Sequence, residues 1–462
     1  MEEDAEIKSE RNFTFILVAY FAYFVLNRNK QGITRRRSMK KLLTVLLSCL
    51  LIFTLTGCGE KTTDTGTSDS GKVHIRFMVN GSAAELALYQ KAVDAFNAQS
   101  ETTEVEMIGD SGDDFAAVLI TQLSTNEAPD VFYSDDSSFG EMNKSGVLLD
   151  ITSYLNDSAS KLTADQVPDS AKYAFEYDGG IRGVPVDANP EVIYFNRGLF
   201  EELGIKTPTE YDAEGQWTLE NFEKVMTELN KAGKYPFVWE NWWGPIYSFL
   251  INKGDKLFDG TKANFNTDRV KYGMNFIEKN FKSGNIIWAG TLESGESADS
   301  LFMAGDTGMV YSGRWSLPDY SETALDFDTV IFPYYEKREN ATNTICSTAM
   351  VINKACKNAD NAWEFVSFYC GAEGQRIRME GQGNAVPTVP GLEDIYVTGV
   401  PANSTAYKDA MANGFYYSKE EFLHPGLSDA INGEIEKLLV GDQDAAATVT
   451  AMQSVAEELL AE

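Results

Sequence analysis

Histidine is nearly absent from this chain, which contains only His74 and His424 among 462 residues. Two histidines supply neither a His-based catalytic triad nor a His-rich metal cluster. The Gly-x-Ser-x-Gly nucleophile elbow, the phosphate-binding P-loop and the His-Glu-x-x-His zinc pattern are missing as well. These absences argue against an enzyme that works through such groups.

Basic side chains are also scarce, with 39 Lys+Arg against 69 Asp+Glu and a net charge of −30. Residues 1–57 hold five of the acidic and nine of the basic groups, which leaves 64 acidic against 30 basic groups beyond them. A surface of this charge repels nucleic acids and anionic lipid head groups. With 43% hydrophobic and 12% aromatic residues the chain can build large cores, and its length favours two lobes.

The N-terminal region has the three parts of a secretion signal over residues 39–57. Met39-Lys40-Lys41 is basic, 42–55 is apolar, and the segment ends in Leu-Thr-Gly-Cys at Cys58. This ending resembles the bacterial lipobox, which implies that Cys58 is the lipidated first residue of the mature protein. The alternative is a chance thiol in a membrane anchor. Residues 58–71 are rich in Thr, Ser, Gly and Asp and predict a flexible tether.

Residues 1–38 precede this signal, and Met39 is a better start than Met1. We interpret 1–38 as translated upstream sequence or a dispensable extension. A second anchor is the alternative, although the apolar run 13–26 is shorter than the roughly 20 residues of a membrane span.

A family resemblance becomes specific over residues 179–222. The residues that carry it are Gly179, Gly183, Pro185, Tyr194, Asn196, Phe200, Gly204, Ile205, Pro208, Trp217, Thr218 and Phe222. This pattern resembles the extracellular solute-binding proteins of ABC importers, in the sugar-binding branch that includes maltose-binding protein. The resemblance extends from about residue 73 to the C-terminus.

Alternating strand and helix patterns predict an α/β fold with a mainly parallel sheet near the start. Strands are expected over 73–79, 103–108 and 131–133, with helical stripes between them over 86–96 and 115–123. The run 183–186 suits an edge strand, 191–195 is a further strand, and a helix opens at 196 and ends at Gly204. Later helices are expected over 219–229, 270–281, 300–303, 361–370 and 447–460, and strands over 309–311 and 348–353.

The resemblance implies a two-lobed periplasmic-binding-protein type II fold whose discontinuous lobes are joined by a hinge. The N-lobe would take 72–186 plus 347–392, and the C-lobe 190–345 plus 393–462. Beyond Cys58 the cysteines are Cys346, Cys356 and Cys370, an odd number. We expect free buried thiols; if a pair forms, Cys346 with Cys370 is the candidate.

Aromatic and polar residues gather at two places in the expected C-lobe. Sugars need planar carboxylates and amides for their hydroxyls and aromatic planes for their C–H faces. The run 239–243 offers three tryptophans beside Glu240, and we expect Trp242 or Trp243 in the cleft with another tryptophan packed inside. Trp315 matches the Gly-x-Trp that places a ring under the sugar in the family. Arg314 either donates to ring hydroxyls or simply pairs on the surface.

The N-lobe candidates follow predicted strands, at whose carboxyl ends ligands gather in open α/β sheets. Asn80 and Ser82 follow the first strand. Asp135 and Asp136 follow the third, where one is expected to cap the next helix and the other to bind. Asp187, at the lobe crossing, either binds ligand or ties the hinge. The weaker candidates are Gln382 and Asn384, in a loop that reads as a plain turn.

These observations favour a lipid-anchored solute-binding component of an ABC importer that captures a carbohydrate and changes no bond. Adjacent Asp135 and Asp136 are poor glycosidase carboxylates, because the two acids must flank the bond from opposite sides. The expected partners are a carbohydrate, permease subunits and the membrane through the lipid, with a monomeric chain, no cofactor and no nucleic acid. The alternative is a secreted carbohydrate-active enzyme or adhesin. A calcium site in the Asp-rich loops stays open, although no EF-hand spacing occurs.

Overall fold

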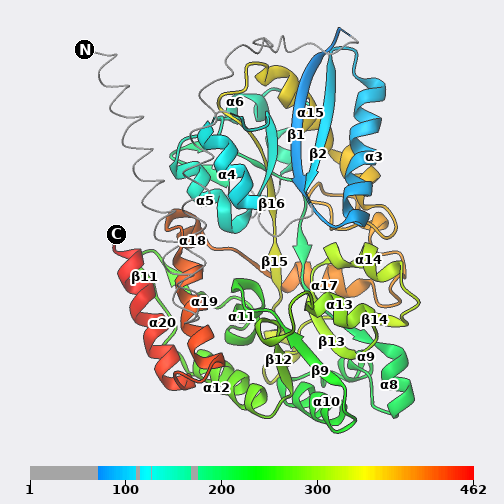
Figure 1. Cartoon of the computed structure of the whole chain (residues 1–462), viewed down its shortest axis with the longest axis vertical. Helices are drawn as coiled ribbons and strands as arrows, with labels where there is room; N and C mark the ends of the chain where they lie inside the picture. Colours follow the sequence, from blue (N-terminus) through cyan, green and yellow to red (C-terminus); the bar gives the residue numbers. More distant parts are fainter. Residues whose placement is uncertain (1–70, 111–114, 126, 168–174) are drawn as a thin grey trace, which may run out of the picture. The chain divides into compact units, whose positions relative to one another are not determined.

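The computed structural model describes residues 71–110, 115–125, 127–167 and 175–462 (Figure 1). The predicted signal peptide 39–57, Cys58 and the tether up to residue 70 lie outside these residues. Among the helices of the described ranges, none combines the length and the apolar character needed to cross a bilayer.

The first of two five-stranded sheets has the order β2-β1-β3-β16-β6. Its strands are β1 (Val73–Asn80), β2 (Thr103–Asp110), β3 (Val131–Asp135), β6 (Val184–Pro185) and β16 (Thr348–Ile352). β1 runs parallel to β2 and β3, whereas β16 is antiparallel to β3 and β6. The predicted strands are confirmed. β6 lies at the edge of the sheet, where its proline does not interrupt the hydrogen bonds between inner strands. We call the part built on this sheet the N-lobe.

The second five-stranded sheet has the order β12-β9-β13-β8-β14 and forms the centre of what we call the C-lobe. Its strands are β8 (Val192–Asn196), β9 (Tyr235–Trp239), β12 (Ile286–Trp288), β13 (Thr307–Ser312) and β14 (Phe327–Val330). β9 is parallel to β12 and β13, and β8 is antiparallel to β13 and β14. The carboxyl ends of β9 and β13 therefore lie at the same edge of this sheet.

Helices cover both sheets, and the predicted apolar stripes are buried. α10 (Leu219–Lys231) buries Leu219, Phe222, Val225, Met226 and Leu229, the stripe that the sequence indicated. The helix predicted to end at Gly204 is α8 (Arg197–Leu203); the Asn196 side chain caps its start, and Gly204 adopts the left-handed conformation (φ 66°) that glycine accepts without strain.

The other helices are α3 (Ala83–Gln99), α4 (Phe115–Thr125), α5 (Asp136–Lys144), α6 (Thr152–Leu155), α9 (Pro208–Ala213), α11 (Trp243–Leu250), α12 (Asp268–Lys282), α13 (Ala298–Met303), α14 (Leu317–Ser321), α15 (Ala359–Tyr369), α16 (Ala372–Met379), α17 (Thr405–Asn413), α18 (Lys419–Leu423), α19 (Leu427–Leu439) and α20 (Ala445–Leu460). In Figure 1, α3 and α15 lie beside the first sheet, and α10 lies beside β9 of the second.

A small three-stranded sheet lies where the chain passes between the two large sheets. It consists of β7 (Asn189–Pro190), β15 (Thr344–Cys346) and β17 (Phe415–Tyr416), in the order β17-β15-β7. β7 lies in sequence between β6 of the first sheet and β8 of the second, and β15 leads into β16 (Figure 1). The crossing inferred at 187–190 is therefore present, while the exact bounds of the two lobes stay a prediction.

The cysteines of the described residues are free as expected, but only Cys370 is buried, whereas Cys346 and Cys356 are partly exposed. Cys346, Cys356 and Cys370 are all free, so the alternative pairing of Cys346 with Cys370 does not form. Cys370 is buried, and its Sγ lies 3.5 Å from Sδ of Met350, so it packs as a small apolar group.

Candidate functional site

Two half-buried tryptophans meet at the carboxyl-terminal edge of the second sheet. Trp242 follows β9 and Trp315 follows β13, and their ring centroids lie 6.4 Å apart with planes inclined at 52°. β9 and β13 are neighbouring parallel strands, so the fold brings these two rings together. Both remain partly accessible. They form a bent aromatic surface of the kind that contacts the C–H faces of a sugar.

Glycines fix the position of both rings. A Cβ at Gly244 would stand 2.5 Å from the ring of Trp242, and a Cβ at Gly313 would overlap the ring of Trp315. Each indole therefore lies directly across the backbone of a nearby glycine. The Gly-x-Trp spacing at 313–315 consequently has a steric reason: any larger residue at 313 would move the ring.

The other two tryptophans of the 239–243 run are buried. Trp239 is 0% exposed in β9, and Trp243 is 3% exposed and packs against Phe415 and Tyr417. The expectation that Trp242 or Trp243 lies in a ligand cleft stays a prediction, and only one of the two is accessible for that role. Trp242 is the accessible one, and Trp243 supports the base of α11.

Two carboxylates lie beside the tryptophan pair. Glu240 is half-buried; burial raises its pKa, the charge of Asp299 raises it further, and the backbone N–H of Ala298 lowers it by hydrogen bonding. Asp299 accepts hydrogen bonds from the hydroxyls of Tyr320 and Ser316, and burial raises its pKa too. Asp299 was not predicted, because a single Asp in the first turn of a helix usually signals only helix-end electrostatics.

The predicted residues after β1 lie at the start of α3. Asn80 is exposed, and Ser82 caps α3 by accepting a hydrogen bond from the backbone N–H of Glu85 at 3.2 Å. The Glu85 carboxylate closes this capping box at 3.0 Å from the Ser82 N–H. Burial raises the pKa of Glu85, and the charge of Asp319 on α14 of the C-lobe raises it as well. Glu85 thus faces the other lobe, a role that its capping pattern alone does not reveal.

One of the two adjacent acids, Asp135 and Asp136, caps the following helix, as expected. Asp135 caps α5 through a 2.7 Å hydrogen bond from the Ser138 N–H. Asp136 is 7% exposed; burial raises its pKa well above the ordinary value, the charge of Asp135 raises it further, and hydrogen bonds from the Ser347 N–H and the Trp243 side chain lower it. The Asp136 carboxylate therefore lies beneath the crossing, and little of its surface is accessible to a ligand.

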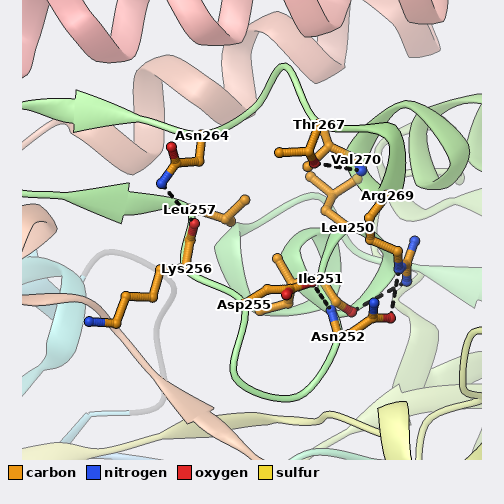
Figure 2. Close-up of a pocket in the computed structure, with 10 residues that line it drawn as sticks. All are labelled: Leu250, Ile251, Asn252, Asp255, Lys256, Leu257, Asn264, Thr267, Arg269 and Val270. Atoms are coloured by element: carbon orange, nitrogen blue, oxygen red, sulfur yellow. Dashed lines mark hydrogen bonds between the residues drawn. The ribbon is translucent and has the colours of Figure 1, made fainter.

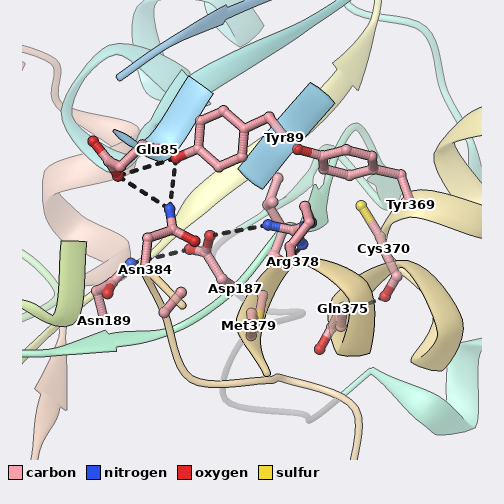
Figure 3. Close-up of polar contacts among 12 residues, drawn as sticks. Glu85, Tyr89, Asp187, Asn189, Tyr369, Cys370, Gln375, Arg378, Met379 and Asn384 are labelled. Atoms are coloured by element: carbon pink, nitrogen blue, oxygen red, sulfur yellow. Dashed lines mark hydrogen bonds and ion pairs between the residues drawn. The ribbon is translucent and has the colours of Figure 1, made fainter. Parts of the chain in front are cut away.

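Asp187 belongs to a buried polar network at the crossing (Figure 3). Its carboxylate lies 3.7 Å from Nη1 of Arg378 and accepts a 3.3 Å hydrogen bond from Asn189. Burial raises the pKa of Asp187 to about 6, against the lowering effect of Arg378. Arg378 also donates to the carbonyl of Val186 at 2.9 Å. These contacts correspond to the hinge-tying alternative for Asp187.

Hydrogen bonds join the Arg314 side chain to the loop 380–387. The Arg314 side chain is fully buried and donates to the backbone carbonyls of Gly381 at 2.7 Å, Met379 at 3.4 Å and Ala385. A guanidinium buried in this way is not presented to a ligand, and it does not pair on the surface either, so both alternatives predicted for Arg314 are wrong. A single arginine beside a strand gives no sign in the sequence that a distant loop will bury it. Asn384, a weaker candidate, is also buried and donates to Glu85 at 3.0 Å and to the Tyr89 hydroxyl at 2.6 Å (Figure 3).

Glu191 was missed by sequence reasoning because it looks like one residue of a strand. It is 0% exposed, and neither carboxylate oxygen has a hydrogen-bond partner among the described residues. Burial raises its pKa well above the ordinary value. The Thr344 hydroxyl is near enough to lower that pKa, but it donates to the carbonyl of Gly244 at 2.6 Å.

Two surface hollows lie away from the tryptophan pair. One of about 330 Å³ lies at the C-terminal end of α11, beside Arg269, and is shown in Figure 2. Arg269 donates there to Asn252 at 3.0 Å and stacks on Tyr335 at 4.9 Å. The other, of about 470 Å³, lies on the N-lobe beside Tyr177 and Arg182. Neither is lined by a predicted site residue.

Two α/β lobes joined by a short crossing are the architecture of the two-lobed solute-binding proteins. The family profile of bacterial extracellular solute-binding proteins matches residues 80–376, and the chain belongs to this family. The multiple sugar-binding protein of Streptococcus mutans is 24% identical over 351 residues, 70% of this chain and 77% of that protein. The sn-glycerol-3-phosphate-binding periplasmic protein of Agrobacterium fabrum is 22% identical over 352 residues, 71% of this chain and 79% of its own.

Solved structures share the fold. An ABC substrate-binding protein from Listeria monocytogenes, in complex with cycloalternan, superposes with a TM-score of 0.74 at 20% identity. The superposition covers 84% of this chain and 98% of the other. The periplasmic-binding-protein fold expected from the sequence is therefore confirmed.

Proposed function

We propose that the protein is the solute-binding component of an ABC importer and that it binds a sugar or oligosaccharide between its lobes. The observation that carries this proposal is the pair of half-buried rings, Trp242 and Trp315, with Glu240 and Asp299 beside them. Rings supply stacking surface, and carboxylates accept hydrogen bonds from paired hydroxyls. Family membership and the name of the Streptococcus mutans relative support the same ligand class.

The N-lobe completes the site in this proposal. Asn80 and Ser82 lie at the end of β1, and Asp135 lies at the end of β3, where their polar atoms can reach a ligand held on the rings. Asp136, Asp187, Trp243 and Arg314 act indirectly, by fixing the crossing and the loops beside it. Binding would draw the lobes together and present a joint surface to the permease, without chemical change of the ligand.

A thermal-shift screen of the chain from residue 59 against mono- and oligosaccharides tests the proposal. A ligand at 100 times its Kd raises the stability of the folded state by about 2.7 kcal/mol. Trp315→Ala should remove the shift and keep the fold. Tyr235→Ala is the control, because Tyr235 is exposed at the opposite end of β9 from Trp242. Absence of a shift with every sugar, or a full shift in Trp315→Ala, would refute the proposed site.

The same preparation separates binding from the alternative of a carbohydrate-active enzyme. A binding protein should become more compact in small-angle scattering when the ligand is added and should return the oligosaccharide unchanged. Release of shorter sugars, measured by chromatography, would establish turnover and overturn the proposal.

We also propose that lipid on Cys58 anchors the mature, monomeric protein to the outer face of the membrane. In a Gram-positive host, the wild-type protein should sediment with membranes and Cys58→Ala should appear in the medium. Membrane retention of Cys58→Ala would refute the lipid anchor and leave the binding function untouched.

A further inference from the structure

Four carboxylates from the two lobes act on one another through their charges, and two of them, Glu240 and Asp299, lie beside the tryptophan pair. Glu85 belongs to α3, Glu240 follows β9, Asp299 begins α13, and Asp319 lies in α14. Burial is the main cause that raises the pKa of Glu85, Glu240 and Asp299. The charge of Asp319 adds to this effect for Glu85 and Asp299, and the charge of Asp299 adds to it for Glu240. Among the described residues, no lysine, arginine or histidine forms an ion pair with any of these four acids.

Both fully buried arginines bind other groups, although Arg314 Nε and Arg378 Nε and Nη1 have no hydrogen-bond partner among the described residues. Arg314 donates to the carbonyls of the loop 380–387, and Arg378 pairs with Asp187 and donates to Val186. Neither forms an ion pair with the four acids. A neutral sugar would satisfy the hydrogen-bonding capacity of these carboxylates but would leave their mutual repulsion in a poorly hydrated site.

Glu191 supplies independent evidence for a missing polar partner beside the tryptophan pair. Its side chain is entirely buried, and both oxygens lack hydrogen-bond partners among the described residues. Glu191 Oε2 lies 2.9 Å from the position that a Cβ on Gly244 would occupy, and the ring of Trp242 lies 2.5 Å from that same position. The unpartnered carboxylate is thus directly beside the accessible tryptophan. A buried carboxylate without a partner is expensive, which indicates a donor that the chain does not supply.

We propose that the carbohydrate bound here carries positive charge, as an amino sugar with free amines, rather than being neutral or anionic. The inference rests on the proposed carbohydrate site and specifies its ligand. An ammonium donates three charge-assisted hydrogen bonds to carboxylates and is attracted to an indole face. A uronic acid or a sugar phosphate would be repelled. The described residues contain no group of three acidic, histidine or cysteine side chains that could hold a metal ion, which favours an extended ligand over a single cation.

Titration calorimetry with matched trisaccharides tests the charge of the ligand. The probes are the β-1,4 trimer of glucosamine, its fully N-acetylated form, maltotriose and spermidine, at pH 6.5 and two salt concentrations. The glucosamine trimer should bind at least about tenfold more tightly than its acetylated form, with an affinity that falls as salt rises.

Other outcomes would contradict either the positive charge of the ligand or the carbohydrate function itself. Equal or tighter binding of the acetylated trimer or of maltotriose overturns the charge inference and leaves the carbohydrate function standing. Binding of spermidine without any sugar overturns both, as does binding of no probe when the wider sugar screen is also negative.

Substitutions of single carboxylates test which residues produce the preference for a charged sugar. Glu240→Gln and Asp299→Asn each keep the side-chain shape and should weaken glucosamine-trimer binding about tenfold, while changing maltotriose binding less than about threefold. Glu202→Gln, at an exposed position of α8, is the charge-matched control and should change neither. An equal loss for both sugars in Glu240→Gln and Asp299→Asn would show that the carboxylates only accept hydroxyl hydrogen bonds, which contradicts the proposal.

Discussion

Glu421 tests how a buried carboxyl group makes the stability of this protein depend on pH. It lies in α18, 2% exposed, and accepts hydrogen bonds from the Tyr247 hydroxyl at 2.8 Å and from the N–H and hydroxyl of Ser418 at 3.0 and 2.8 Å. Burial outweighs these hydrogen bonds and raises the pKa of Glu421 to about 7. The charge of nearby Glu420 acts in the same direction.

The sign of the pH effect follows from proton binding. Between pH 4.5, the ordinary pKa of a glutamate, and about pH 7, the folded protein holds a proton on Glu421 that the unfolded chain has already lost. The contribution of Glu421 to the free energy of unfolding is therefore most favourable below pH 4.5 and falls as the pH rises to about 7. A shift of two to three pKa units corresponds to a total change of about 3 kcal/mol.

Glu421→Gln removes this titration and keeps a side chain that can accept from Ser418 and contact Tyr247. The variant should match the wild type at pH 4.5 and exceed its free energy of unfolding by up to about 3 kcal/mol at pH 8. Urea unfolding followed by tryptophan fluorescence at pH 4.5, 6 and 8 measures the difference, and Glu202→Gln serves as the exposed control. A difference that is independent of pH, or that favours the wild type at pH 8, would refute the reasoning.

Three further substitutions test single structural contacts. Arg314→Met removes the buried donors to the loop 380–387 and should lower the free energy of unfolding by about 3 kcal/mol in urea titration; an unchanged midpoint would contradict the role of this contact. Gly313→Ala should displace the ring of Trp315 and abolish the ligand-induced thermal shift while the circular dichroism spectrum stays native. Gly198→Ala is the control and should keep the thermal shift, because the nearest atom to its new Cβ would be 3.6 Å away, an ordinary contact distance. Asp135→Ala should cost about 1 kcal/mol through the lost cap of α5, and Asp135→Ser should recover most of it; equal loss in both would mean that capping is not its contribution to stability.

The sequence predicted the long elements of the fold because they repeat a physical pattern many times. The stripe from Leu219 to Leu229 and the helix bounded by Asn196 and Gly204 combine periodicity with end signals, and both appear as expected. The strands β7, β15 and β17 are two or three residues long, too short for any period. They became visible only in three dimensions, because their pairing joins segments that are distant in the sequence, as in Ile345 opposite Pro190 and Thr344 opposite Phe415.

The candidate site was harder to predict, because residue type does not reveal which way a side chain points. Trp242 and Trp243 are adjacent and chemically identical, yet α11 begins at Trp243 and turns that ring into the core while Trp242 stays at the surface.

Arg314 and Trp315 show the same limit. They adjoin in a motif suited to sugar binding, but a loop more than 60 residues later occupies the guanidinium and leaves the indole accessible. Glu85 and Glu191 were missed for the opposite reason. Glu85 satisfies a local capping pattern, and Glu191 lies in a strand-like run, so each has a sufficient local role in the sequence. Only the folded chain shows that Asp319 of the C-lobe acts on Glu85, and that Gly244 of the same lobe lies beside Glu191. Charge that is brought together across two lobes leaves no signature in either segment alone, and this is why the acidity of the site emerges only from the folded chain.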